Sequence, residues 1–361
     1  MTLLLFFAGL VLLILGADLM VRGASRLSLS LGIAPLVVGL TVVAFGTSAP
    51  ELAISIKGVL AGQTDIALGN VVGSNIFNVL FILGLSAVLA PLVVDRQLIQ
   101  QEVPILIGLS ALVAWMAMDL RISTLDGLAL MTVLVAYSVL LYRQGNRAPA
   151  AETADVALVE IAARPGLMTR LPVQLLLIAV GLAMLVIGSR WLVDAATTFA
   201  TMLGVSQLVI GLTIVSIGTS LPEVATSVIA ALRGEREIAV GNVLGSSIFN
   251  LAAVLGISAS ISGGGLQVPE TLLAFDLPVM VAVAVACLPV LFTGHLIARW
   301  EGALFLGYYA AYTTYLILFA QRHSALEQFA LVMRVGVMPL TVLTLAVVAW
   351  RELRRWRRSR P

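Results

Sequence analysis

The chain alternates long apolar stretches with short polar ones, and this pattern predicts helices that cross a membrane. About 20 apolar residues are needed to span the hydrocarbon core of a bilayer. Eleven stretches fit, and we expect helices near 2–21, 33–61, 66–93, 103–118, 124–142, 173–193, 207–232, 238–262, 272–293, 300–320 and 329–350. The pattern therefore predicts an all-α membrane protein, a polytopic bundle of 10–11 transmembrane helices.

The sequence also repeats itself. GLTVVAFGTSAPE at 39–51 matches GLTIVSIGTSLPE at 211–223 in nine of thirteen positions, and DIALGNVVGSNIFN at 65–78 matches EIAVGNVLGSSIFN at 237–250 in ten of fourteen. Both matches have an offset of 172 residues, and five predicted spans separate equivalent points. An odd number of crossings makes the second copy enter the membrane from the opposite face, as in many secondary transporters.

This repeat predicts two inverted-topology five-helix halves and two further segments. The first half covers 1–142 and the second covers 173–320, with a polar cytoplasmic linker at 143–172 between them. The remaining residues, 321–361, are expected to form an extra C-terminal helix with a basic cytoplasmic tail.

The basic residues predict the orientation, because cytoplasmic loops of membrane proteins are enriched in Lys and Arg. With the N-terminus outside, 16 of the 21 basic residues lie on the cytoplasmic side, six of them in the tail RELRRWRRSRP. We therefore expect the N-terminus outside and the C-terminus in the cytoplasm. The compact chain, without a long regulatory insert, favours a bacterial inner membrane.

Composition excludes several function classes. Charged residues make up 11% of the chain, against about 25% in soluble domains, and a net charge of +2 does not indicate nucleic-acid binding. The single lysine, Lys57, is not in a P-loop, and His295 and His323 form no zinc-protease motif. No nucleophilic side chain with an adjacent general base is evident either. We therefore expect that the protein is not an enzyme and has no cofactor, and that an ion gradient drives transport.

Each repeat carries the polar motif Gly-Thr-Ser-x-Pro-Glu inside an apolar helix. Its chemistry-bearing residues are Thr47, Ser48 and Glu51 in the first half, and Thr219, Ser220 and Glu223 in the second. A carboxylate at membrane depth is costly unless it is paired, and no basic residue is near either glutamate in sequence. Proline interrupts the helical hydrogen bonds and frees backbone oxygens, while a spacing of four places each Thr and Glu on one helix face. A bound cation is the natural counter-ion.

The next helix of each half supplies a second face of oxygen-bearing side chains. Ser74 and Asn78 are four residues apart, as are Ser246 and Asn250. Two further amides, which either cap and pack or coordinate, are Asn70 and Asn242. Oxygen donors suit Ca²⁺, which takes six to eight of them. Two ionised glutamates match one Ca²⁺ or two Na⁺, so competition for the same carboxylates would couple the two ions.

These paired motifs resemble the alpha repeats of the cation:calcium exchanger superfamily, specifically its sodium/calcium exchanger branch. The resemblance implies calcium extrusion driven by sodium entry, with the first and sixth helices sliding past a fixed core. The calcium ligands that it implies are Glu51, Glu223 and the backbone oxygens of Thr47 and Thr219. The implied sodium sites use Ser48, Ser74, Ser220, Ser246 and the carbonyls of Ala44 and Ser216, with Asn78 and Asn250 lining the centre.

Some relatives have Asp in place of Asn78 or Asn250, and the amides in this chain argue against potassium co-transport. The sequence thus predicts a Ca²⁺/Na⁺ antiporter with the bilayer and the two ions as its partners. A Ca²⁺/H⁺ antiporter is the alternative within this class, because a buried glutamate can also bind a proton. A calcium-permeable channel is the alternative from another class, although inverted halves with broken helices favour a carrier. Stoichiometry and oligomeric state stay open.

Overall fold

The computed structural model of the chain describes residues 2–145, 170–203 and 216–358, and it is almost entirely helical. Within these ranges, nine helices are long and apolar enough to cross a membrane, or ten when one bent pair counts as a single span. The predicted span at 207–232 is described only from residue 216 onward, and most of the predicted linker 143–172 lies outside the described residues. The all-helical polytopic prediction is confirmed.

The first half begins with α1 and ends with α8. Its helices are α1 (Thr2–Leu31), α2 (Pro35–Val38), η1 (Gly39–Val43), α3 (Ala44–Thr47), α4 (Ala49–Leu60), α5 (Thr64–Phe77), η2 (Asn78–Leu83), α6 (Gly84–Leu89), η3 (Leu98–Glu102), α7 (Val103–Met116), η4 (Ala117–Asp119) and α8 (Thr124–Gly145).

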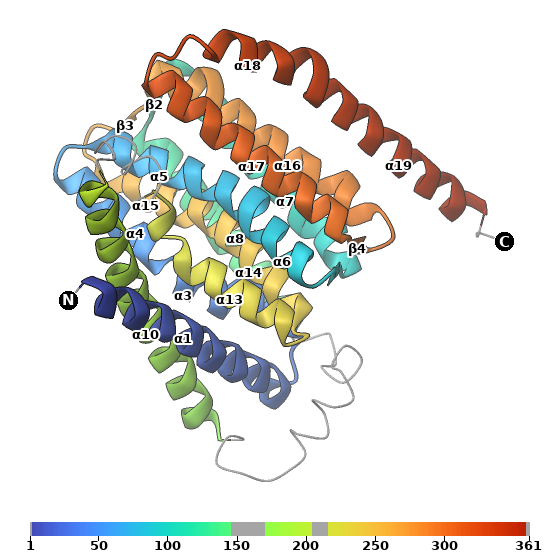
Figure 1. Cartoon of the computed structure of the whole chain (residues 1–361). Coiled ribbons are helices and arrows are strands. Elements are labelled where there is room, and N and C mark those ends of the chain that lie inside the picture. The colour runs from blue at the N-terminus through green and yellow to red at the C-terminus, as the bar shows by residue number, and fades with distance from the viewer. Residues whose placement is uncertain (1, 146–169, 204–215, 359–361) are drawn as a thin grey trace.

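The second half repeats this order, and further helices follow it. They are α10 (Leu171–Met202), α12 (Ser216–Gly218), α13 (Leu221–Leu232), α14 (Arg236–Phe249), η7 (Asn250–Val254), α15 (Leu255–Ile261), η8 (Leu272–Asp276), α16 (Leu277–Phe292), α17 (Arg299–Ala320), α18 (Leu326–Val332), η9 (Met333–Val337) and α19 (Met338–Arg358). Figure 1 shows α18 and α19 along one edge of the bundle, beside α17 and α16.

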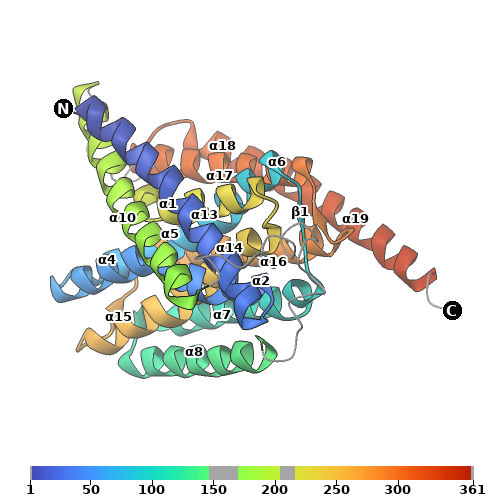
Figure 2. The same cartoon turned by 90° about the horizontal axis from the view of Figure 1, so that it is seen from below.

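Helices α1 and α10 occupy another edge, where they lie side by side (Figures 1 and 2). A Cβ atom built on Gly9 would lie 2.8 Å from the carbonyl oxygen of Gly188, and one on Gly16 would lie 2.8 Å from that of Gly181. Glycines at these positions allow the two backbones to touch. Because residue numbers rise along one helix as they fall along the other, these equivalent helices are antiparallel, as inverted repeats require.

Two short antiparallel strand pairs join the halves at their ends. Strand β1 (Leu92–Val93) pairs with β4 (Leu296–Ile297), and β2 (Arg121–Ile122) pairs with β3 (Leu266–Gln267). In each pair, one strand comes from the first half and one from the second. The halves are therefore linked reciprocally rather than standing as separate units.

Several helices are longer than their apolar stretches predict. The expected helix at 2–21 extends to Leu31, and that at 173–193 extends from Leu171 to Met202. The predicted stretches stop just before the charged residues Arg22 and Asp194, but the added turns of α1 have their own polar partners. Ser25 Oγ, for example, donates a 2.7 Å hydrogen bond to Glu235.

Candidate ion-binding site

The polar motif of each half lies where its helix breaks. In the first half, α3 ends at Thr47 and α4 begins at Ala49, with a bend of 42° between the two segments. In the second half, α13 begins at Leu221 after a turn at 219–220. Each proline lies in the first turn of the new helix, where its missing N–H needs no partner.

This arrangement places both carboxylates at helix N-termini. Glu51 lies in the first turn of α4 and Glu223 in the first turn of α13. Unpaired N–H groups and the helix dipole make such an end favourable for negative charge. Both side chains are nevertheless almost completely buried, at 0% and 1% exposure.

The two halves exchange hydrogen bonds at the site. Ser220 Oγ donates to Glu51 Oε1 over 2.9 Å, and Ser48 Oγ donates to Glu223 Oε1 over 3.0 Å. Ser220 Oγ also lies 3.3 Å from Ser74 Oγ. Each carboxylate therefore contacts the serine of the other half.

The helix expected to carry Thr47 and Glu51 on one face is interrupted between them, at Ser48. The shared face of these two residues therefore stays a prediction. Thr47 Oγ1 donates to Asn242 Oδ1 over 3.1 Å and lies 3.4 Å from Ser246 Oγ. The same interruption separates Thr219, which lies half-buried in the turn before α13, from its glutamate.

Asn70 and Asn242 brace the backbone of the two glutamates. Asn70 Nδ2 donates to the Glu51 carbonyl over 3.2 Å, and Asn242 Nδ2 donates to the Glu223 carbonyl over 3.4 Å. Each amide also donates to a serine that the sequence analysis did not single out. These serines are Ser55, at 3.0 Å, and Ser227, at 2.8 Å. Because the two serines are 172 residues apart, the repeat offset could have identified them.

The remaining predicted residues surround this centre. Asn78 and Asn250 are both 1% exposed, and each begins a π-helical segment, η2 or η7. Such segments often mark functional sites because they turn side chains out of the α-helical register. The Ala44 carbonyl lies 3.5 Å from Ser246 Oγ. Ser216 begins α12, and its side chain is not among those described.

Several buried polar atoms in this cluster have no hydrogen-bond partner within the described residues. They are Glu51 Oε2, Glu223 Oε2, Thr219 Oγ1, Asn78 Oδ1, Asn250 Oδ1 and Asn250 Nδ2. Buried polar atoms are nearly always paired. Because nearly all atoms of this set are oxygens, the set indicates a site for a ligand that oxygen atoms coordinate. Within the described residues, the ion pairs join Asp18 to Arg22 and to Arg233. Neither Glu51 nor Glu223 has a cationic partner there.

Comparisons with known proteins found a family, curated relatives and solved structures to which this chain is similar. The family model described as "Sodium/calcium exchanger protein" matches residues 1–143 and 173–318. The chain is 39% identical to the "Putative antiporter CaxA" of Alkalimonas amylolytica over 71% of this chain and 79% of that protein. It is 36% identical to the "Inner membrane protein YrbG" of Escherichia coli (strain K12), over 78% and 86%. A solved structure of the sodium-calcium exchanger NCX_Mj superposes with a TM-score of 0.72 and 30% identity, covering 88% of this chain and 97% of that one.

Proposed function

Because the chain belongs to the sodium/calcium exchanger protein family, we propose that it exchanges Ca²⁺ for Na⁺ across a membrane by alternating access. Membership makes the chain a multi-pass integral membrane protein and an antiporter of the cation/calcium exchanger type, and not an enzyme. The ion pair is the proposed part. The similar structure of NCX_Mj, which was soaked with Na⁺ and Ca²⁺, supports it.

One observation carries the proposal. Glu51 and Glu223 are buried together, each with one carboxylate oxygen that lacks a partner among the described residues. Two carboxylates without a protein cation at membrane depth need a mobile counter-charge. When both are ionised their charge of −2 equals the charge of one Ca²⁺ or two Na⁺, so either set of ions neutralises the site and excludes the other.

The proposed ligands are the residues that resemblance to the sodium/calcium exchanger family implies. We assign Ca²⁺ to the two carboxylates with the backbone oxygens of Thr47 and Thr219, and Na⁺ to flanking positions. The flanking ligands are Ser48, Ser74, Ser220, Ser246 and the carbonyls of Ala44 and Ser216, with Asn78 and Asn250 toward the middle. The hydrogen bonds of Ser48 and Ser220 to the opposite carboxylates support this, because a hydroxyl that donates to a carboxylate can turn its oxygen toward a cation.

Ion coupling is tested in proteoliposomes. The purified chain is reconstituted with internal Na⁺, diluted into Na⁺-free buffer containing ⁴⁵Ca²⁺, and compared with vesicles without a Na⁺ gradient. We expect Ca²⁺ uptake only with the outward Na⁺ gradient, and the same uptake with an added protonophore.

Other outcomes would replace the proposal. Uptake driven by a pH gradient and indifferent to Na⁺ identifies a Ca²⁺/H⁺ antiporter. Uptake without any counter-ion, at rates far above those of carriers, identifies a channel.

We also propose a bacterial inner membrane, with the N-terminus outside and the C-terminus in the cytoplasm. The relative named "Inner membrane protein YrbG" supports the membrane assignment. Cysteine labelling in intact cells tests the orientation, since the native Cys287 is buried. Exposed Lys57 and Arg96 are the positions for new cysteines. An impermeant maleimide should label Lys57→Cys and spare Arg96→Cys; the reverse result inverts the topology.

A further inference from the structure

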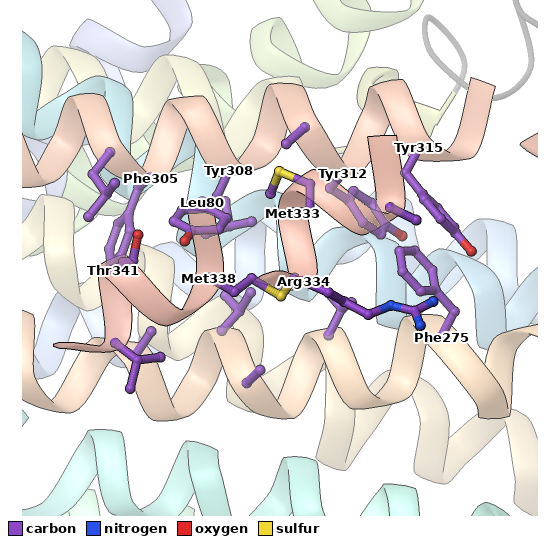
Figure 3. Close-up of a pocket in the computed structure, with 18 of the residues that line it drawn as sticks. Leu80, Phe275, Phe305, Tyr308, Tyr312, Tyr315, Met333, Arg334, Met338 and Thr341 are labelled. Atoms are coloured by element: carbon purple, nitrogen blue, oxygen red, sulfur yellow. The ribbon is translucent and has the colours of Figure 1, made fainter. Parts of the chain in front are cut away.

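A groove separates the C-terminal helices from the rest of the bundle. The matched family region ends at residue 318, so α18, η9 and α19 lie beyond it. The groove between these helices and α16 and α17 has a volume of about 520 Å³ and a mainly apolar lining (Figure 3). Pockets that bind small molecules have volumes of ~300–1,000 Å³.

The groove contains one charged side chain, that of Arg334 in η9. Figure 3 shows this side chain lying along the groove, with its guanidinium group beside Phe275 and toward Tyr315. Within the described residues, Arg334 forms no ion pair, since the pairs found there involve Asp18. An arginine inside a membrane span normally has a partner of opposite charge.

The depth of the guanidinium group indicates what that partner is. Arg334 lies eight residues after Leu326, the start of its span, which corresponds to ~12 Å along a helix. Its side chain runs back toward the same end of the span, where Tyr315 lies five residues before the end of α17. Long basic side chains reach the membrane interface in this way, and tyrosines collect at that level. The guanidinium group therefore lies near the level of lipid headgroups.

Acidic side chains on the adjoining helices do not neutralise it. Asp276, the last residue of η8, accepts a 2.7 Å hydrogen bond from Tyr312 and is not part of the groove lining. Glu327, in the first turn of α18, forms no ion pair within the described residues. The groove thus joins a long apolar surface to one unpaired guanidinium group, which is the complement of an anionic amphiphile.

We propose that this groove binds one anionic phospholipid of the surrounding bilayer. Its phosphate accepts hydrogen bonds from Arg334, whose planar guanidinium group suits two phosphate oxygens at once. One acyl chain lies along the apolar wall toward Phe305 and Thr341, at the far end of the groove in Figure 3. The bound lipid fills the space that separates the C-terminal helices from the family core. This assignment does not depend on which ions the protein exchanges.

Native mass spectrometry of the purified full chain tests the proposal. The protein is titrated with phosphatidylglycerol or phosphatidylcholine carrying the same acyl chains, and bound lipids are counted. We expect one phosphatidylglycerol to bind at least tenfold more tightly than phosphatidylcholine. Arg334→Gln should remove this tenfold preference and leave phosphatidylcholine binding unchanged. The matched control is Arg322→Gln, an arginine at the same end of the span but outside the groove lining, and it should keep the preference.

Two further measurements keep the test decisive. Thr341→Trp should fill the acyl end of the groove and weaken binding of the tight phosphatidylglycerol while Arg334 is intact. Soluble glycerol phosphate should not displace the lipid, since it lacks the acyl chain. The proposal is overturned if wild-type protein binds both lipids equally, if the two arginine variants behave alike, or if glycerol phosphate displaces the lipid. Melting curves show whether each variant folds. If Arg334→Gln does not fold, Arg334→Ala replaces it.

Discussion

Replacing Glu51 by glutamine tests the charge balance of the candidate site most directly. The substitution keeps the size of the side chain and removes one negative charge, so Ca²⁺ in the variant site carries one unbalanced positive charge. An unpaired charge at the centre of a membrane helix costs ~2.5–3.5 kcal/mol on insertion scales. At ~1.4 kcal/mol per factor of ten, Ca²⁺ affinity should fall about 60- to 300-fold. One Na⁺ still balances the remaining carboxylate of Glu223, so Na⁺ binding should be affected less.

The assay is isothermal titration calorimetry of purified protein with Ca²⁺ and, separately, with Na⁺. Glu102→Gln is the matched control, because Glu102 is also 0% exposed and lies within a membrane-length helix, Leu98–Asp119, but outside the site. Its carboxylate accepts hydrogen bonds from Tyr137 at 2.7 Å and Gln101 at 2.9 Å. The control should keep wild-type Ca²⁺ affinity, while Glu223→Gln should behave like Glu51→Gln.

Two results would refute the reasoning. The first is a Glu51→Gln protein that binds Ca²⁺ as tightly as wild type and still transports it. The second is an equal loss of affinity in the Glu102→Gln control, since the effect would then come from replacing any buried acid. Apparent melting temperatures measured on the same samples separate loss of binding from loss of folding.

Three further predictions follow from particular contacts. Ser48→Ala and Ser220→Ala each remove a hydrogen bond to an ionised carboxylate, so calorimetry should show similar losses of Ca²⁺ affinity, about tenfold or more; a loss in one variant alone would contradict the reciprocity. Gly16→Ala should lower the apparent melting temperature, because the new Cβ meets a backbone oxygen at 2.8 Å and overpacking costs ~1–3 kcal/mol, whereas Gly307→Ala meets nothing and should not. Tyr137→Phe leaves a buried carboxylate with one donor fewer, at a cost of ~1–3 kcal/mol, and should lower the melting temperature while Ca²⁺ transport persists.

The sequence was sufficient for the architecture because the repeat constrains it strongly. A constant offset of 172 residues relates α4 to α13 and α5 to α14, and it brings the two Thr-Ser-x-Pro-Glu motifs into corresponding helices. The hydropathy pattern was the basis for the predicted number of membrane-spanning helices. Proline, which cannot continue the hydrogen-bond ladder, added the helix breaks beside Glu51 and Glu223.

Contacts between the halves could not be predicted in the same way. The offset states which residues are equivalent but not which of them meet, so it gives no sign that Ser220 donates to Glu51 rather than to its own Glu223. Each of the four strands has two residues, too few for a periodic pattern. The π-helical turns at Asn78 and Asn250 depend on tertiary packing and leave no mark in the hydropathy.

One difference between the repeats bears on how equally the two halves contribute ligands. Position 75 is Asn, but its equivalent at 247 is Ser. Asn78 Nδ2 donates to Ser247 Oγ over 3.5 Å, whereas Asn75 donates its own amide hydrogen to the Val71 carbonyl and both polar atoms of Asn250 lack partners in the described residues. The oxygen of each amide, Oδ1, is the atom that would contact a cation, and neither Asn78 Oδ1 nor Asn250 Oδ1 has a partner in the described residues. The substitution at position 247 therefore changes how the amide N–H groups are held, and it leaves the two amide oxygens equally available to an ion.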